Sequence, residues 1–223
     1  MRSLYKILKR KETGSIGIGA MIVFIAMVLV AGIAASVLIQ TSTKLESQAM
    51  ATGRQTADEV SSGIAVYDVV GYANTSNDDD LSKLAIMVRP RAGTDGIDLS
   101  ETYVELADEN KKVILNYTSS FYAEPDGLSD IFNASVFPET PGGLPASQFG
   151  LLVVEDADDS LKKATPVMNS GDKVYICINV TGTHGNIAER VQVFGLIVPE
   201  LGSPGVMNFR TPASYSVDVF DLQ

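Results

Sequence analysis

The chain has 223 residues and carries 17 basic against 27 acidic side chains, a net charge of −10 at pH 7. Such an acidic surface repels phosphate groups and argues against nucleic acid as a partner. Its single cysteine excludes an intrachain disulfide, and one histidine beside one cysteine gives no support for a zinc site or a nucleophilic triad, so we expect no enzyme.

The first long segment, residues 15–43, is apolar and contains neither a charge nor a proline. Its 24 residues from Ile16 to Ile39 would form a helix about 36 Å long, enough to cross a hydrocarbon core of about 30 Å. Five basic residues and one acid precede this segment, so the positive-inside rule keeps the leader in the cytoplasm. The pattern predicts a membrane-inserted helix, with everything after it facing outward.

Three glycines, Gly14, Gly17 and Gly19, lie between the basic leader and the apolar segment. Because glycine frees the backbone, we expect an extended junction there that a peptidase at the membrane surface could cut. Loss of residues 1–14 would remove five bases and one acid and leave a net charge of −14. A plain single-pass anchor, which needs no cut, is the alternative.

Small residues gather toward the far end of the apolar segment, at Ala31, Gly32, Ala35 and Ser36. Their four-residue spacing lets helix backbones approach one another closely. Residues 44–63 contain no proline and continue a weak helical periodicity. Together these features predict one helix over residues 15–62, roughly 72 Å long, and helices of that length are usually held by lateral packing.

From Gly63 to Gln223, short β-branched and aromatic runs alternate with turn residues, which predicts an all-β, immunoglobulin-like sandwich. The fold class is therefore α+β. In Val174–Val180 the alternation assigns Val174, Ile176, Ile178 and Val180 to the core. It assigns Cys177 to the outward or interface face, as an unreactive packing residue. We expect a long loop over Ser119–Gln148 and a hairpin turn at His184. Nine strands are expected, at Ile64–Tyr72, Leu84–Val88, Thr102–Leu106, Val113–Tyr117, Phe149–Glu155, Val174–Val180, Arg190–Ile197, Val206–Phe209 and Tyr215–Phe220.

Two kinds of modification or ligand site are indicated in this region. N-x-Ser/Thr sequons begin at Asn74, Asn116, Asn133 and Asn179, and they matter in an exported chain. Acidic clusters occur at 78–80, 95/98, 126/130 and 156–159, and each is by default a set of solvated turn residues. The carboxylates of Asp156, Asp158 and Asp159 are the candidate ligands for Ca²⁺ or Mg²⁺.

The stretch GSIGIGAMIVFIAMVLVAGIAASVLIQTS resembles the N-terminus of archaeal flagellins, or archaellins. The resemblance continues in Leu84–Leu106, in Gly171–Thr181 and in Val198–Gln223, so it covers most of the chain. It implies cleavage by a prepilin-type signal peptidase between Gly14 and Ser15, with Gly17 at the third mature position. Residues 1–14 would then be a cleaved class III signal leader.

The same resemblance implies a subunit of the archaellum filament, used for swimming and polymerised through its N-terminal helix. It further implies other archaellins, a membrane assembly platform with its ATPase and an oligosaccharyltransferase as partners. N-linked glycans and an ion in the outer domain are the expected ligands, and the cell surface the expected location, after membrane insertion. An adhesive archaeal type IV pilin and a membrane-anchored surface binding domain are the alternatives.

Overall fold

A computed structural model describes residues 2–75, 80–137 and 143–223 of the chain, with side chains described from Gly17 onward. By compactness the chain divides into two units, one up to Arg54 and one from Gln55 to Gln223. The expected α+β composition, a long N-terminal helix followed by a strand-rich domain, is confirmed.

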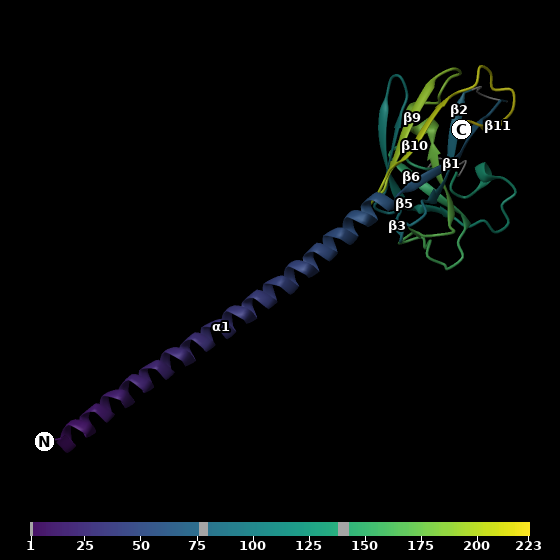
Figure 1. Ribbon diagram of the computed structural model, residues 1–223. Helices are drawn as coiled ribbons and strands as arrows, with labels where there is room; N and C mark the ends of the chain where they lie inside the picture. Colours follow the sequence, from purple (N-terminus) through teal and green to yellow (C-terminus); the bar gives the residue numbers. More distant parts are fainter. Residues whose placement is uncertain (1, 76–79, 138–142) are drawn as a thin grey trace. The chain divides into compact units, whose positions relative to one another are not determined.

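The first element is α1 (Arg2–Ser61), a single helix that is drawn as one uninterrupted coil in Figure 1. It runs through residues 14–19, where we expected an extended junction, so that expectation is wrong. No proline interrupts the first 89 residues, and an isolated glycine costs a helix only about 1 kcal/mol. Near the end of α1, Ser62 N still donates to Asp58 O at 2.8 Å before the chain enters the first strand.

Within the described residues, nine strands form one sheet in the order β10-β9-β4-β5-β6-β8-β2-β1-β11. All neighbours are antiparallel except β5 and β6, which run parallel. Two short strands, β3 (Ile97–Asp98) and β7 (Val167–Met168), pair separately. The strands of the large sheet are β1 (Ile64–Ala73), β2 (Leu81–Pro90), β4 (Tyr103–Ala107), β5 (Lys112–Ala123), β6 (Gln148–Glu155), β8 (Lys173–Asn179), β9 (Gln192–Val198), β10 (Gly205–Arg210) and β11 (Val219–Asp221).

The sheet curls around one main core, so its two halves act like the layers of a sandwich. Phe149 of β6, Ile176 of β8 and Val104 of β4 are fully buried in the same cluster. The two ends of the sheet also meet: Gln223 accepts from Val69 N of β1 at 3.3 Å and, through Oε1, from Asn208 N of β10 at 2.9 Å. The core assignment of the alternating residues in Val174–Val180 is confirmed.

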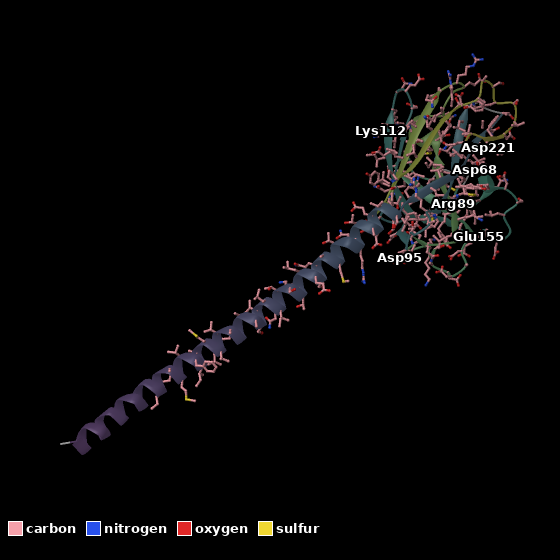
Figure 2. The ribbon with its side chains drawn as sticks, in the orientation of Figure 1. Asp68, Arg89, Asp95, Lys112, Glu155 and Asp221 are labelled. Atoms are coloured by element: carbon pink, nitrogen blue, oxygen red, sulfur yellow. The ribbon has the colours of Figure 1, made fainter. Side chains whose placement is uncertain are left out.

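The β1 and β11 end of the sheet carries paired carboxylates. Asp68 of β1 lies beside Asp221 of β11 (Figure 2), and burial, then the charge of Asp221, raises the pKa of Asp68. Inward or edge charges of this kind discourage pairing with a strand of another chain.

Two expectations about connecting segments are corrected. The segment expected as a loop over Ser119–Gln148 begins as the end of β5, and its described part packs Phe132 and Phe137 over the outer face of the sheet. Cys177, expected on the outward or interface face, is instead fully buried under that cover, where it is a packing residue. The expected hairpin turn at His184 is instead the short helix α2 (Val180–His184), because Asn179 caps its first turn. Pro138 and Pro141 lie outside the described residues.

Candidate functional site

The surface of α1 is the largest unpartnered apolar surface of the described chain. Apolar side chains from Ile18 to Ile39 are 52–69% exposed, on every side of the helix, and Figure 2 shows the side chains of α1 radiating from it. A helix that is apolar all round is stable when it is surrounded by lipid or by other helices. From Gly17 to Ser61, α1 is long and apolar enough to cross a membrane.

The predicted packing residues lie along this surface. Ala31, Gly32, Ala35 and Ser36 are all exposed, and nothing lies within 4 Å of the position where a Cβ of Gly32 would be. A shallow apolar groove extends over Ile22, Val23, Ala26, Met27, Val30, Ala31 and Ala34. The surface therefore offers small residues flanked by large ones, which is what a neighbouring helix needs for close approach.

A second candidate site lies at one end of β6 and β8. The carboxylates of Asp156, Asp158 and Asp172 each place an oxygen within 4.8 Å of the other two. Asp156 accepts from Leu161 N at 3.0 Å and Asp158 from Asn169 Nδ2 at 2.7 Å, so the loop is shaped by its own acids. Separations of this size suit ligands of a cation whose bonds to oxygen are about 2.3–2.6 Å long.

Asp172 is the buried member of this cluster, and one of its carboxylate oxygens lacks a hydrogen bond to the described residues. The residue is 2% exposed, and its Oδ2 accepts from Asn169 N at 2.8 Å while its buried Oδ1 has no hydrogen-bond partner among the described residues. Burial, reinforced by the charges of Asp156 and Asp158, raises the pKa of Asp172, whereas the hydrogen bond from Asn169 lowers the pKa of Asp158. An orphaned buried carboxylate oxygen beside two further carboxylates fits a hard cation.

The predicted ligand set differs from this cluster by one residue. Asp159 is exposed and has a left-handed φ of 57°, which places it in the turn and outside the group of three. Asp172 was missed because it lies 13 positions beyond Asp159. Pairing of Glu155 with Lys173 brings the residues before β8 next to those after β6, so knowledge of that pairing could have identified Asp172.

In two of the other acidic clusters, one carboxylate accepts hydrogen bonds from the local backbone. Asp98 accepts from Ser100 N at 2.8 Å, and Asp130 accepts from Phe132 N at 3.0 Å at the start of the short 3₁₀ helix η1 (Ile131–Asn133). These are turn-capping roles that need no ligand. Asp78 and Asp79 lie outside the described residues.

The four sequon asparagines have different surroundings. Asn116, on β5, and Asn133, at the end of η1, are exposed. Asn179 is half-buried, and its side chain is used at both ends: Oδ1 accepts from Gly182 N at 3.1 Å, and Nδ2 donates to Leu144 O at 3.0 Å. Asn74 is half-buried, and Ser76 of its sequon lies outside the described residues.

Cys177 and His184 are both at least partly shielded from solvent, and burial shifts the pKa of each side chain. Burial raises the pKa of the Cys177 thiol, which keeps it protonated and unreactive. Burial also lowers the pKa of His184, whose Nδ1 lies 2.9 Å from the hydroxyl of Thr183. Cys177 lies on β8 and His184 on α2, and the described contacts of His184 do not include Cys177, so the two do not form a nucleophile and base in contact.

Comparison with known proteins gives matches over nearly the whole chain. The family described as archaeal-type flagellin matches residues 14–209. Flagellin B2 of Methanocaldococcus jannaschii is 40% identical over 222 residues, which cover 99% of each chain.

Two solved structures resemble the fold. The crystal structure of archaeal flagellin FlaB1 from Methanocaldococcus jannaschii aligns with a TM-score of 0.61 at 30% identity, over 73% of this chain and 97% of that one. The archaeal flagellum of Methanospirillum hungatei aligns with the same TM-score at 15% identity, over 92% of this chain and 98% of that one.

Proposed function

This chain belongs to the archaeal-type flagellin family and is a structural subunit of the extracellular archaellum filament, and from that premise we propose how it is processed, packed and modified. The flagellin family is structural, and we assign this chain no catalytic function. Its fellow subunits in the filament are copies of itself and other archaellins.

The helix packing follows from one observation, the apolar surface of α1 on every side. Before assembly lipid covers that surface, and after assembly neighbouring helices cover it, so α1 forms the core of the filament. Ala31, Gly32, Ala35 and Ser36 set how closely neighbours approach. A membrane assembly platform with its ATPase performs the transfer, since moving this much apolar surface through water is unfavourable.

The packing is tested by adding bulk at a small position. Ala35→Leu should lower filament yield and filament melting temperature, because overpacking a closely packed interface costs about 1–3 kcal/mol. Leu29→Ala, in the same helix, is the comparison variant and should have the smaller effect. Equal filament yield and melting for Ala35→Leu and the unchanged chain would show that this face meets no neighbour.

Processing removes residues 1–14 by a prepilin-type signal peptidase that cuts between Gly14 and Ser15. The family match begins at Gly14, and the cut leaves Gly17 near the new N-terminus. Because α1 is helical through this region, the peptidase must first unwind it, and glycine makes that unwinding easier.

Mass spectrometry of filaments sheared from cells tests this processing. The unchanged subunit should begin at Ser15, and Gly14→Val should retain residues 1–14 and give no filaments, because bulk next to the scissile bond blocks access. Gly19→Val makes the same change in the same helix away from the bond and should still be cut. A mature start elsewhere would refute the assigned cut.

An oligosaccharyltransferase adds N-linked glycans to this exported chain. Their exposure favours Asn116 and Asn133 as acceptors, whereas both polar atoms of Asn179 are already used by the fold. A glycan on a folded Asn179 would have to be placed at Nδ2, which already donates to Leu144 O at 3.0 Å in a half-buried position.

A Ca²⁺ or Mg²⁺ ion in the outer domain is held by Asp156, Asp158 and Asp172. When bound, the ion supplies the positive charge that three adjacent carboxylates need. The chain itself contributes two loops tied together by hydrogen bonds through Ser160 and Asn169, so that the acids are positioned before binding. The support for this site is the buried, unpartnered Oδ1 of Asp172.

A further inference from the structure

We propose that Tyr103 is a platform for the first sugar of a glycan carried by Asn116, so that this glycan is part of the folded surface of the domain. The inference rests on the proposed glycosylation and deepens it, because it names the residue that receives the sugar. The ligand is a pyranose ring covalently joined to Asn116 Nδ2.

Strand register brings the two residues together. Tyr103 of β4 pairs directly with Asn116 of β5, and directly opposed residues of an antiparallel pair have side chains on the same face. Their Cβ atoms are then about 4.5–5.5 Å apart. Leu115 and Val104, their neighbours, point into the core, so Tyr103 and Asn116 both face outward.

Three apolar side chains lie on the outward face around this place, beside the charged Glu105. Tyr103 is 37% exposed and Ile114, on the same side of β5, is 53% exposed. Val198 of β9 pairs with Tyr103 from the other side and is half-buried. Apolar side chains on both neighbouring strands therefore flank the place where Tyr103 and Asn116 meet.

A sugar ring matches this surface in chemistry and in size. One face of a pyranose is lined by C–H groups that pack against an aromatic ring, while its hydroxyl groups keep their contact with water. The linkage to Asn116 holds the sugar next to the ring, so little further freedom is lost when the two meet. Glu105, which pairs with Ile114 on this face, forms a salt bridge to Lys112 at 2.6 Å, and so a charged pair adjoins the apolar side chains. Lys112 is labelled in Figure 2.

The other sequons that lie wholly within the described residues lack this arrangement. Asn179 pairs with Lys83 of β2 and caps α2. Asn133 lies at the end of η1, outside the sheet, and the aromatic residue next to it, Phe132, is buried. Exposure alone therefore does not distinguish Asn116 from Asn133, but the facing tyrosine does.

The test is a double-mutant cycle on the full mature chain in filaments made by a glycosylating archaeal host. Asn116→Gln removes the glycan, and Tyr103→Thr removes the ring while keeping a residue that favours strands. We expect Asn116→Gln to lower the melting temperature by about 2–4 °C in the unchanged background, and to have no effect beside Tyr103→Thr. Tyr103→Phe should restore the effect, because it keeps the ring.

Phe194→Thr is the matched control. Phe194 is also an exposed aromatic residue on this face, but it pairs with Ala107, which places it about four residues along the strands from Asn116, or about 13 Å. The effect of Asn116→Gln should be the same with and without Phe194→Thr.

Glycopeptide mass spectrometry separates the two proposals. A glycan on Asn116 with no thermal coupling to Tyr103 overturns the platform and leaves glycosylation standing. Glycans on other sequons with Asn116 bare overturn the platform as well. A chain without any glycan overturns both proposals together.

Discussion

The helix and the strand domain treat their apolar side chains in opposite ways. Phe149 of β6 is fully buried by its own chain, whereas Phe24 of α1 is 68% exposed. The two phenylalanines have the same chemistry, and what differs is that this chain covers only the first of them. The strand domain thus buries its own core, whereas α1, under the proposed packing, is covered only by lipid or by neighbouring subunits.

The same distinction applies to polar groups inside the strand domain. The side chain of Asn179 is satisfied at both ends by the chain, and Thr211 Oγ1 donates to Ala188 O at 2.8 Å. Asp172 Oδ1 is buried without a partner among the described residues, and Asn116 faces outward beside a tyrosine. Under the proposals above, these two residues are the places where the domain would bind an ion and carry a sugar.

The largest expected effect comes from replacing each of the two phenylalanines with alanine. Phe149→Ala should lower the free energy of unfolding of the strand domain by about 3–5 kcal/mol, because it leaves a cavity in a closed core. Phe24→Ala should leave the thermal melt of the strand domain unchanged and reduce filament yield. Differential scanning calorimetry of subunits in detergent measures the first quantity, and electron microscopy of sheared filaments measures the second.

A drop in the domain melt with Phe24→Ala would mean that the helix contributes to the core of the strand domain. The division of the chain into a self-sufficient part and an assembly part would then be wrong.

Where the pattern was local, the sequence predicted the structure well. The alternation in Val174–Val180 identified the residues that join the main core, since each position reports its own side of the strand, although Cys177 on the other side is buried as well. The absence of charge and proline over residues 15–43 predicted the helix, because both are local requirements. Most strands were also located within a few residues.

Where the structure depends on residues far apart, the prediction failed. The burial of Phe132 and Phe137 over β8 follows from the fold of a segment without periodicity, so it could not be read from spacing. Asp172 joins Asp156 through the pairing of β6 with β8. Local sequence indicates which side of a strand a residue lies on, but it does not indicate which distant segment packs or pairs with that strand.

The second prediction tests whether Ca²⁺ binds at Asp172 and stabilises the strand domain. At 100 times its dissociation constant, Ca²⁺ should stabilise the strand domain by about 2.7 kcal/mol, and Asp172→Asn should abolish that gain. Asp159→Asn, outside the cluster, is the control and should keep it. Thermal melts with and without Ca²⁺ measure the difference, and an equal gain in Asp172→Asn would place the ion elsewhere.

The pH dependence of the metal-free domain gives a second measurement on the same residue. Because burial raises the pKa of Asp172, the contribution of its protonated form to stability is complete below the ordinary value of 3.8 and is lost as pH rises through the raised value. Asp172→Asn should remove that pH-dependent loss, so the metal-free variant should be no less stable than the unchanged chain at neutral pH. A lower stability at neutral pH would show that the charged carboxylate is already satisfied by the chain.

The smallest expected effect concerns a polar group that the chain already satisfies. Asn179→Gln keeps the amide but moves it too far to cap α2, so it should cost about 0.5–2 kcal/mol of domain stability. It should leave the glycan mass of the subunit unchanged, because both polar atoms of Asn179 are used by Gly182 and Leu144. Asn116→Gln is the opposite case and should reduce the glycan mass. Intact-subunit mass spectrometry beside a thermal melt distinguishes them, and a glycan lost with Asn179→Gln would mean that modification precedes folding at this site and displaces the contact of Nδ2 with Leu144 O.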